Sequence, residues 1–343
     1  MVRPGMRPRW ARALRGGLLD RQLAEELPRR QGPGLFEPGE TAWRVYRESA
    51  LVLGGPRALV LQLLHPFVAA GVAEHSRFPD DAPRRLRRTL DCMLGMVFGD
   101  LEWASRCAGS IARAHRPVRG TLPEATPRFP AGTPYDARDP GAARYVHLTL
   151  IDSAIETWRA LVGPLAEEVA DDLVASSHRM APLLGLERET LPQTASEVRA
   201  EIAGLFASGV LYPTRAGRSL IRAVLRPPVA PALRPLARLA EPLTAGLLPE
   251  AARAAAGLRF GSGERAAFAA SAAALRSLRA IAPPSLRVVP HARVVEREIA
   301  RVGASAAVRA ERSDGAPRPP PSPTRGCRPS PLREPRRGRA PAP

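Results

Sequence analysis

Hydrophobic residues recur at intervals of three and four along most of the central chain, the spacing that places side chains on one face of an α-helix. Alternating runs of β-branched and aromatic residues, which would predict strands, are almost absent, and Ala, Leu, Arg and Glu dominate. The pattern predicts an all-α fold. The expected helices span residues 41–53, 57–64, 66–75, 83–98, 100–118, 141–161, 166–180, 195–208, 215–225 and 263–281.

Turn-forming residues and changes in composition divide the chain into three parts. Residues 1–38 form a basic lead-in that closes at a Glu-Pro-Gly-Glu turn signal, and residues 39–301 form one large helical domain. The last part, 302–343, is rich in Pro and Arg and lacks the apolar content needed to offset its ordering entropy, so we expect it to be disordered. Inside the domain, residues 120–140 form a long Pro/Gly-rich loop of the kind that is mobile or functional.

The net charge of +18 suggests a nucleic-acid partner until the cations are sorted by type and place. Every cationic side chain is Arg, and residues 304–343 hold nine Arg against three acids, so a net +6 lies in the predicted tail. The other Arg are scattered over helical faces rather than gathered with aromatic residues. We therefore expect no nucleic-acid partner; the alternative predicts binding that weakens steeply with salt and depends on the tail.

The sequence shows neither a secretion signal nor a membrane span. Residues 1–30 contain several Arg but no continuous apolar segment, and no stretch of the chain approaches the roughly eighteen apolar residues of a spanning helix. The three cysteines, Cys92, Cys107 and Cys327, are too few and too dispersed for a disulfide framework or a zinc site. We expect a cytoplasmic protein with no transmembrane segment and at most a peripheral contact with a membrane.

His115 is the most informative polar residue in the hydrophobic pattern. It follows Cys107 and Ile111 at intervals of four on the apolar stripe of the expected helix 100–118, so its imidazole is predicted to face the core. A buried imidazole needs a partner. It is either a neutral ring bonded to a backbone carbonyl or a metal ligand, and its neighbours must decide between the two.

Two further histidines belong to the same question. His147 begins an apolar series that continues with Leu150 and Ile151, so a cavity shared with His115 becomes an alternative to two separately satisfied core histidines. His65 precedes Pro66, which disfavours a helical conformation at the histidine and predicts a sharp bend. The side chain of His65 is either a cap at that bend or a pocket residue.

Arg85, Arg88 and Thr89 lie three and four residues apart and therefore share one face of the expected helix 83–98. This face is well away from the apolar stripe of the same helix, which is typical of a solvated basic surface. The functional alternative places the helix beside a cavity. The guanidinium groups would then bind an anion such as a porphyrin propionate or polarise an oxygen substrate.

Other catalytic patterns fail. The chain has no G-x-S-x-G elbow, no P-loop and no H-E-x-x-H motif. Asp152 and Glu156 lie four residues apart, but the Glu-x-x-His pairs of a di-iron helix bundle are missing. Cys107 shares a face with His115, which makes thiolate ligation of haem conceivable, although a small buried apolar residue is the commoner role of cysteine.

Several blocks of the chain, in this order, resemble the catalytic domains of MpaB-type oxygenases and rubber oxygenases (latex clearing proteins). The resemblance is strong from about Trp43 to Leu161 and looser as far as Pro284. Its blocks are Trp43–Glu48, Gly54–Val72, His75–Ser76, Arg85–Leu90, Phe98–Asp100, His115–Gly120, Tyr135–Pro140 and Val146–Leu150.

The resemblance implies an all-α, globin-reminiscent domain that binds haem b without covalent attachment. In it His115 matches the proximal iron ligand, Arg85 and Thr89 match polar residues beside the haem, and His147 falls in a block near the pocket. Arg88 stands where latex clearing proteins carry a distal Lys that can occupy the iron. Because a guanidinium stays protonated and is a poor ligand, the distal side is expected to be open or water-filled, and polyisoprene is not the expected substrate.

These features together predict a haem-dependent oxygenase that uses dioxygen on a hydrophobic, lipid-like or unsaturated small molecule, with an unidentified electron donor if one is needed. The alternative is a haem protein that binds or senses without turnover. The expected site residues are His115 as iron ligand, His147 and His65 as further cofactor-binding residues, and Arg85, Arg88 and Thr89 as catalytic residues.

Overall fold

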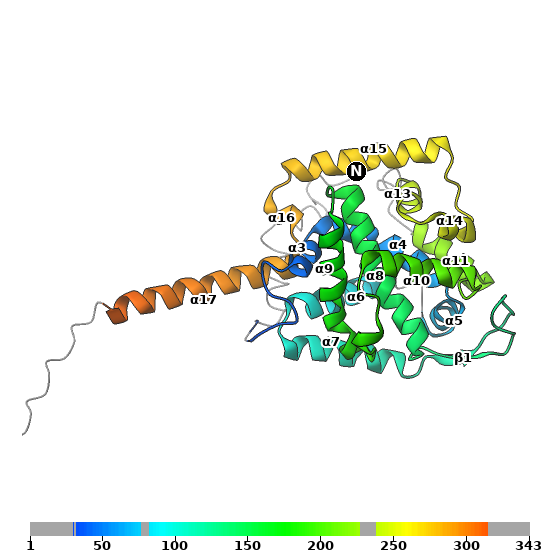
Figure 1. The fold of residues 1–343 in the computed structure, drawn as a ribbon, viewed down its shortest axis with the longest axis horizontal. Helices are drawn as coiled ribbons and strands as arrows, with labels where there is room; N and C mark the ends of the chain where they lie inside the picture. Colours follow the sequence, from blue (N-terminus) through cyan, green and yellow to red (C-terminus); the bar gives the residue numbers. More distant parts are fainter. Residues whose placement is uncertain (1–29, 31, 77–81, 227–237, 315–343) are drawn as a thin grey trace, which may run out of the picture. The chain divides into compact units, whose positions relative to one another are not determined.

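The computed structural model describes residues 30, 32–76, 82–226 and 238–314, which form fourteen α-helices and one two-stranded sheet (Figure 1). The all-α prediction is confirmed. Short 3₁₀ helices join the α-helices at η1 (Ser49–Gly54), η2 (His178–Leu184) and η3 (Arg188–Thr190). The α-helices and strands are α3 (Thr41–Tyr46), α4 (Gly55–Leu63), α5 (Pro66–His75), α6 (Ala82–Phe98), α7 (Leu101–His115), β1 (Arg119–Thr121), β2 (Pro134–Asp136), α8 (Pro140–Leu161), α9 (Glu167–Ser177), α10 (Ala195–Ala207), α11 (Arg215–Leu225), α13 (Ala240–Leu247), α14 (Glu250–Ala256), α15 (Ser262–Ile281), α16 (Pro284–Arg287) and α17 (Pro290–Asp314).

Short polar side chains determine where several helices begin. The carboxylates of Asp100 and Asp139 accept backbone N–H groups of the first turns of α7 and α8, at 2.8 and 2.7 Å. Thr194 and Glu197 form a reciprocal capping box at the start of α10. Each contact satisfies an amide that has no partner inside its own helix, so the sequence itself fixes these starts.

Helix α8 runs through the centre of the domain and contacts α4, α9, α10 and η1. Its side chains Tyr145, Leu148, Ile151 and Ile155 are almost completely buried. The Tyr145 hydroxyl donates a hydrogen bond of 2.6 Å to the carbonyl oxygen of Leu61 on α4, which satisfies its one polar atom inside the core. The other helices are therefore arranged around α8.

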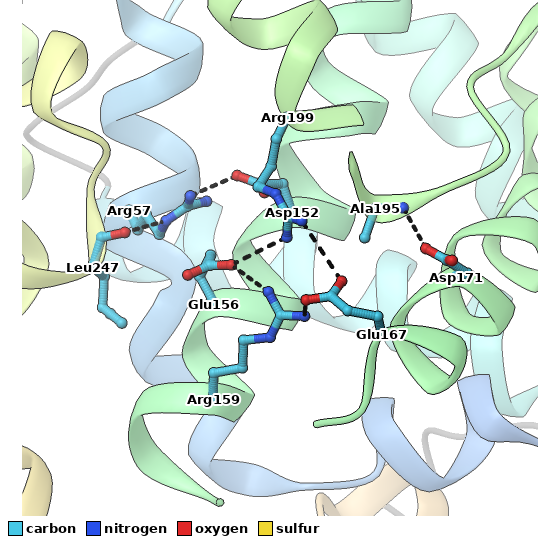
Figure 2. Close-up of polar contacts among 9 residues, drawn as sticks. All are labelled: Arg57, Asp152, Glu156, Arg159, Glu167, Asp171, Ala195, Arg199 and Leu247. Carbon is cyan, nitrogen blue, oxygen red and sulfur yellow. Dashed lines mark hydrogen bonds and ion pairs between the residues drawn. The ribbon is translucent and has the colours of Figure 1, made fainter. Parts of the chain in front are cut away.

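A buried ion pair joins α4 to α8 (Figure 2). Arg57 contacts Asp152 at 2.5 Å, and both side chains are buried. The same guanidinium donates to Ser153 Oγ and to the carbonyl oxygen of Leu247, each at 2.7 Å. Because three acceptors surround the guanidinium, the desolvation of the two charges is compensated. Asp152, considered above as a possible metal ligand, is therefore part of a structural clamp.

Glu156, one helical turn after Asp152, belongs to a more exposed network that links α8, α9 and α10 (Figure 2). Arg159 contacts Glu156 at 3.2 Å and Glu167 at 2.7 Å. Arg199 contacts the same two carboxylates at 4.0 and 3.6 Å. Both carboxylates are therefore neutralised by Arg, and partly exposed pairs of this kind contribute less to stability than the buried clamp.

The segment expected to be a long loop folds onto the helices. Its ends pair as the antiparallel strands β1 and β2. Between them, Phe129 packs against Phe67 of α5 with ring centroids 4.8 Å apart. Glu124 accepts the backbone N–H of Arg215 at the start of α11, at 2.6 Å. The segment is therefore a hairpin with its own contacts to α5 and α11, and the prediction of a loop is wrong at its two ends, which are strands.

The expected helix 41–53 is not continuous. α3 ends at Tyr46, Glu48 is extended, and the chain resumes as η1. The interruption coincides with tertiary contacts, because Glu48 forms an isolated β-bridge with Val288 and the carbonyl oxygen of Arg47 accepts the N–H of Val289 at 2.8 Å. Helices α13, α14, α16 and α17 were not among the expected elements. Distant backbone contacts thus override the local helical pattern near residue 48.

The chain divides into two compact units, Met1–Ile299 and Ala300–Pro343. α17 continues to Asp314, so the first residues of the predicted tail are helical, and the rest of that tail lies outside the described residues. Most of the expected lead-in also lies outside them. Phe36, near the end of the lead-in, is completely buried and packs in the main core. The core therefore begins before the expected start of the helical domain.

Among the described residues, no single helix has the length and apolar character required to cross a membrane. The pair Ser49–Leu63 and Pro66–His75 meets the criteria of length and composition together, with a bend of 104°.

The buried clamp generates a stability prediction. Arg57→Met leaves the Asp152 carboxylate buried without its cation, so we expect the free energy of unfolding to fall by about 3–5 kcal/mol in urea denaturation. Arg106→Met is the matched control, because its pair with Glu102 is exposed on α7 and should contribute less than about 0.5 kcal/mol. Equal losses in the two variants would show that the clamp does not carry this stability.

Candidate functional site

Helices α6 and α7 form an antiparallel hairpin with small residues at its closed end. A Cβ added to Gly95 would collide with the indole of Trp103 and would lie 3.1 Å from Cys107 Sγ. One turn earlier on α6, the thiol of Cys92 contacts Cys107, and burial, with Cys92 as the next cause, raises the pKa of Cys107 to about 12. Cys107 is therefore a protonated packing residue, and the thiolate alternative for this position is not supported.

The contacts of Cys92 and Gly95 with α7 show which face of α6 packs against α7 at the closed end of the hairpin. Arg85, Arg88, Cys92 and Gly95 follow one another at intervals of three, four and three, so these positions share one face. On this face, Cys92 and Gly95 contact α7. Arg88 and Thr89 are exposed, which agrees with the interpretation as a solvated basic face, and they lie beyond the tightly packed end of the hairpin.

The antiparallel register places the polar turn of α6 level with the last turn of α7. Moving back along α6 from Cys92 leads to Arg88 and Arg85, while moving forward along α7 from Cys107 leads to Ile111 and His115. The structure thus brings the α6 residues expected at the site to the same end of the hairpin as His115.

His115 itself does not face the core, which corrects the expectation from the apolar stripe. Burial falls along that stripe, because Ala104, Cys107 and Ala108 are buried, Ile111 is half-buried and His115 is exposed. The helix ends at His115, three residues before its expected end at residue 118, because Pro117 cannot continue a helix. The imidazole therefore sits at a helix end that extends past the packed core.

His65 caps α5, as one of the two alternatives predicted. Its Nδ1 accepts the N–H of Phe67 at 3.3 Å, and its ring packs among Phe67, Phe129 and Tyr145. Burial lowers the pKa of His65 to about 4. Because Nδ1 accepts a hydrogen bond, the proton of the neutral ring lies on Nε2, so this side chain is a donor rather than a ready metal ligand.

His147 is buried as expected, but it pairs with a histidine that the sequence did not single out. Its Nε2 lies 3.0 Å from Nδ1 of His178, whose Nε2 donates to the carbonyl oxygen of Pro192 at 2.7 Å. Burial lowers the pKa of both rings, to about 3 for His147. The pair is therefore neutral, with the Nε2–H of His147 donating to His178.

His291 is a second histidine that sequence reasoning missed. It is buried near the start of α17, and its Nε2 lies 3.4 Å from a carboxylate oxygen of Asp91 on α6. Neither ring nitrogen has a hydrogen-bond partner among the described residues. Burial lowers the pKa of His291, opposed by the charge of Asp91. No sequence signal identifies this contact, because the two residues are 200 positions apart.

A surface depression of about 710 Å³ lies where α5 meets the β-hairpin and the start of α8. Phe67, Pro134 and Tyr135 supply much of its apolar wall. The Tyr135 hydroxyl donates to Glu74 at 2.5 Å, and Arg138 makes a two-bond contact with Asp136. β1, part of this wall, begins four residues after His115, so the depression adjoins the chain that leaves the end of α7.

The buried histidines predict how stability depends on pH. Because the pKa of His147 is about 3, against about 6.5 in an unfolded chain, the folded form binds fewer protons and stability falls as pH drops below 6.5. At pH 5 the loss from His147 is about 2 kcal/mol. In urea titrations between pH 7.5 and 5, His147→Gln should show a shallower decline than the wild type. His75→Gln, an exposed control, should keep the wild-type slope, and an unchanged slope in His147→Gln would refute the assignment.

Comparison with known proteins now gives the family. The sequence matches the family described as "ER-bound oxygenase mpaB/B'/Rubber oxygenase, catalytic domain" over residues 43–280, well over half of the chain. The match runs from α3 to the end of α15 and includes the α6–α7 hairpin. No curated protein and no solved structure matches significantly, so the expected globin likeness is not confirmed. The chain belongs to the MpaB/rubber-oxygenase catalytic-domain family.

Proposed function

We propose that this protein is a haem b-dependent oxygenase that uses dioxygen on a hydrophobic small-molecule or lipid-like substrate, unsaturated ones included. The proposal is supported by the family match together with the α6–α7 hairpin, in which α7 ends at His115 and positions 85 and 88 of α6 lie toward the same open end. An imidazole opposite a cationic, hydrogen-bonding turn is the arrangement that the family resemblance predicts around haem.

The chemistry of the available donors fits haem. The described residues contain no group of three or more His, Cys, Asp or Glu side chains able to hold a metal ion. A porphyrin supplies its own donors to iron and needs as little as one imidazole from the protein. Of the half-buried apolar side chains of the hairpin, Met93, Leu94 and Ile111 pack against the main core, and Leu90 lies nearer the open end of α6.

Four side chains have distinct roles in this proposal. Haem, when bound, supplies the activation of dioxygen and the oxidation itself. His115 would hold the iron, and Arg85 would pair with a propionate. Arg88 and Thr89 would supply hydrogen-bond donors that orient dioxygen. Because a guanidinium is a poor metal ligand, Arg88 would donate hydrogen bonds rather than bind the iron.

His65 and His147 support the site indirectly. Burial keeps each imidazole neutral, and one ring nitrogen of each forms a hydrogen bond inside the protein. His65 fixes the start of α5, and His147 fixes η2 through His178. We therefore assign iron ligation to His115 and give the other two histidines positioning roles.

The depression beside β1 is the proposed approach for the substrate. Its wall combines Phe67, Pro134 and Tyr135 with the stems of Arg119 and Arg138. Aromatic and proline surfaces favour an apolar ligand, while the few polar groups limit its orientation. Because β1 follows the end of α7 along the chain, this wall supports a substrate position on the same surface as the exposed His115.

The proposal predicts a specific loss of cofactor. His115→Ala should bind haem at least about tenfold more weakly than the wild type, since even the loss of an outer-shell partner of a metal ligand costs 10–100-fold. Added imidazole should restore haem binding to His115→Gly. The Soret absorbance per mole of purified or hemin-reconstituted protein measures both effects.

His75→Ala is the matched control, because His75 is also exposed, and among the described residues its Nε2 contacts the carbonyl oxygen of Arg119 and, more distantly, Glu74. It should retain wild-type haem content. Oxygen consumption with lipid-like substrates then separates an oxygenase from a haem sensor. Haem retained with unchanged spectra in His115→Ala would overturn the assignment of the ligand.

A further inference from the structure

Three large aliphatic side chains project into solvent where α15 ends and α16 begins. Ile281 is 82% exposed, Leu286 61% and Leu278 59%, and among the described residues of the larger unit these are the most exposed large hydrophobic side chains. We call them the α15–α16 edge. Figure 1 shows α15 along the outside of its unit, with α16 beneath one end. Soluble surfaces usually carry such residues singly, so three within nine residues of sequence require an explanation.

The edge is held rigidly outward. Pro283 and Pro284 fix the backbone between the helices. The N–H of Leu286 bonds to the carbonyl oxygen of Pro283 at 2.9 Å, and the carbonyl oxygen of Leu286 accepts the hydroxyl of Ser49 at 2.5 Å. The opposite face of α15 is anchored by Ala272, which is buried in a cluster with α8 and α13. These contacts hold the backbone of α15 and α16 in place, so Leu278, Ile281 and Leu286 stay on the surface rather than in the core.

The segment of sequence that contains the edge carries charges of one sign. Between Glu264 and Glu296 the sequence has five Arg and no acidic residue. Arg279 is neutralised by Glu48, at 2.7 Å, but Arg276 donates to the neutral carbonyl oxygen of Ala160 and keeps its positive charge. An apolar edge within a basic, acid-free segment is complementary to a surface that is both apolar and anionic.

We propose that the α15–α16 edge docks this protein on an anionic phospholipid bilayer. Ile281, Leu278 and Leu286 enter the boundary between headgroups and acyl chains, and the neighbouring Arg contact lipid phosphates, the combination found in interfacial membrane binding. Val52 and Leu53 of η1, which contacts α16, are also exposed. Three principal side chains are too few for a specific protein interface, which uses about 20–30 residues a side.

This inference goes beyond the proposed oxygenase activity and does not depend on it, because α15 and α16 contain none of the residues assigned to haem. Membrane docking would bring the protein to the phase in which hydrophobic substrates are dissolved.

Vesicle flotation of the full chain tests the proposal. Wild-type protein should bind vesicles of phosphatidylcholine and phosphatidylglycerol more tightly than vesicles of phosphatidylcholine alone. The triple variant Leu278→Ser, Ile281→Ser and Leu286→Ser should bind the anionic vesicles at least about tenfold more weakly, the effect of withdrawing roughly two methylene groups from lipid. Leu239→Ser is the control, because Leu239 is also exposed but lies at the start of α13. It should bind as the wild type does.

A second variant reports insertion without depending on a loss of function. The added fluorescence of Ile281→Trp should shift to the blue on anionic vesicles and be quenched by brominated acyl chains. Three results would overturn the proposal: wild-type protein that does not float with anionic vesicles, a triple variant that floats as well as the wild type, or a wild-type dimer that the triple variant dissociates without any change in vesicle binding. The second result would place the lipid contact elsewhere in this Arg-rich chain.

Discussion

Gly95 allows α6 and α7 to approach so closely that any side chain at this position would collide with Trp103. The same contact brings Cys92 against Cys107 and fixes the register of the hairpin. This register determines how far along the hairpin positions 85 and 88 of α6 lie relative to position 115 of α7. The chemistry proposed for the protein thus depends on a contact between small residues at the closed end, two turns away from the groups that would perform it.

The sequence predicts the helical framework well because its signals are local. Apolar periodicity, capping carboxylates such as Asp100 and Asp139, and the proline at position 66 each act within one or two turns, and the observed helices follow them closely. The prediction fails where distant segments meet. Glu48 is extended because it pairs with Val288, and no local pattern contains that contact.

The histidines show why the site is harder to predict than the fold. Periodicity gives the direction of a side chain from the helix axis, but not how far the packed core extends along that axis. His115 therefore lies on the apolar stripe and is nevertheless exposed, whereas His147 is buried. The hydrogen-bond partner of His147, which is His178, and the ion-pair partner of Arg57, which is Asp152, lie on other elements of the fold. Periodicity within one helix therefore does not identify these pairs, and the folded structure is needed to find them.

Resonance Raman spectroscopy of the ferrous, haem-loaded protein tests the central claim most directly, because it detects the bond between iron and imidazole itself. The account predicts an iron–histidine stretching band that shifts when histidine is labelled with ¹⁵N and that is absent from a variant lacking the imidazole at position 115. A protein that takes up no haem, or a band that persists in that variant, would contradict it.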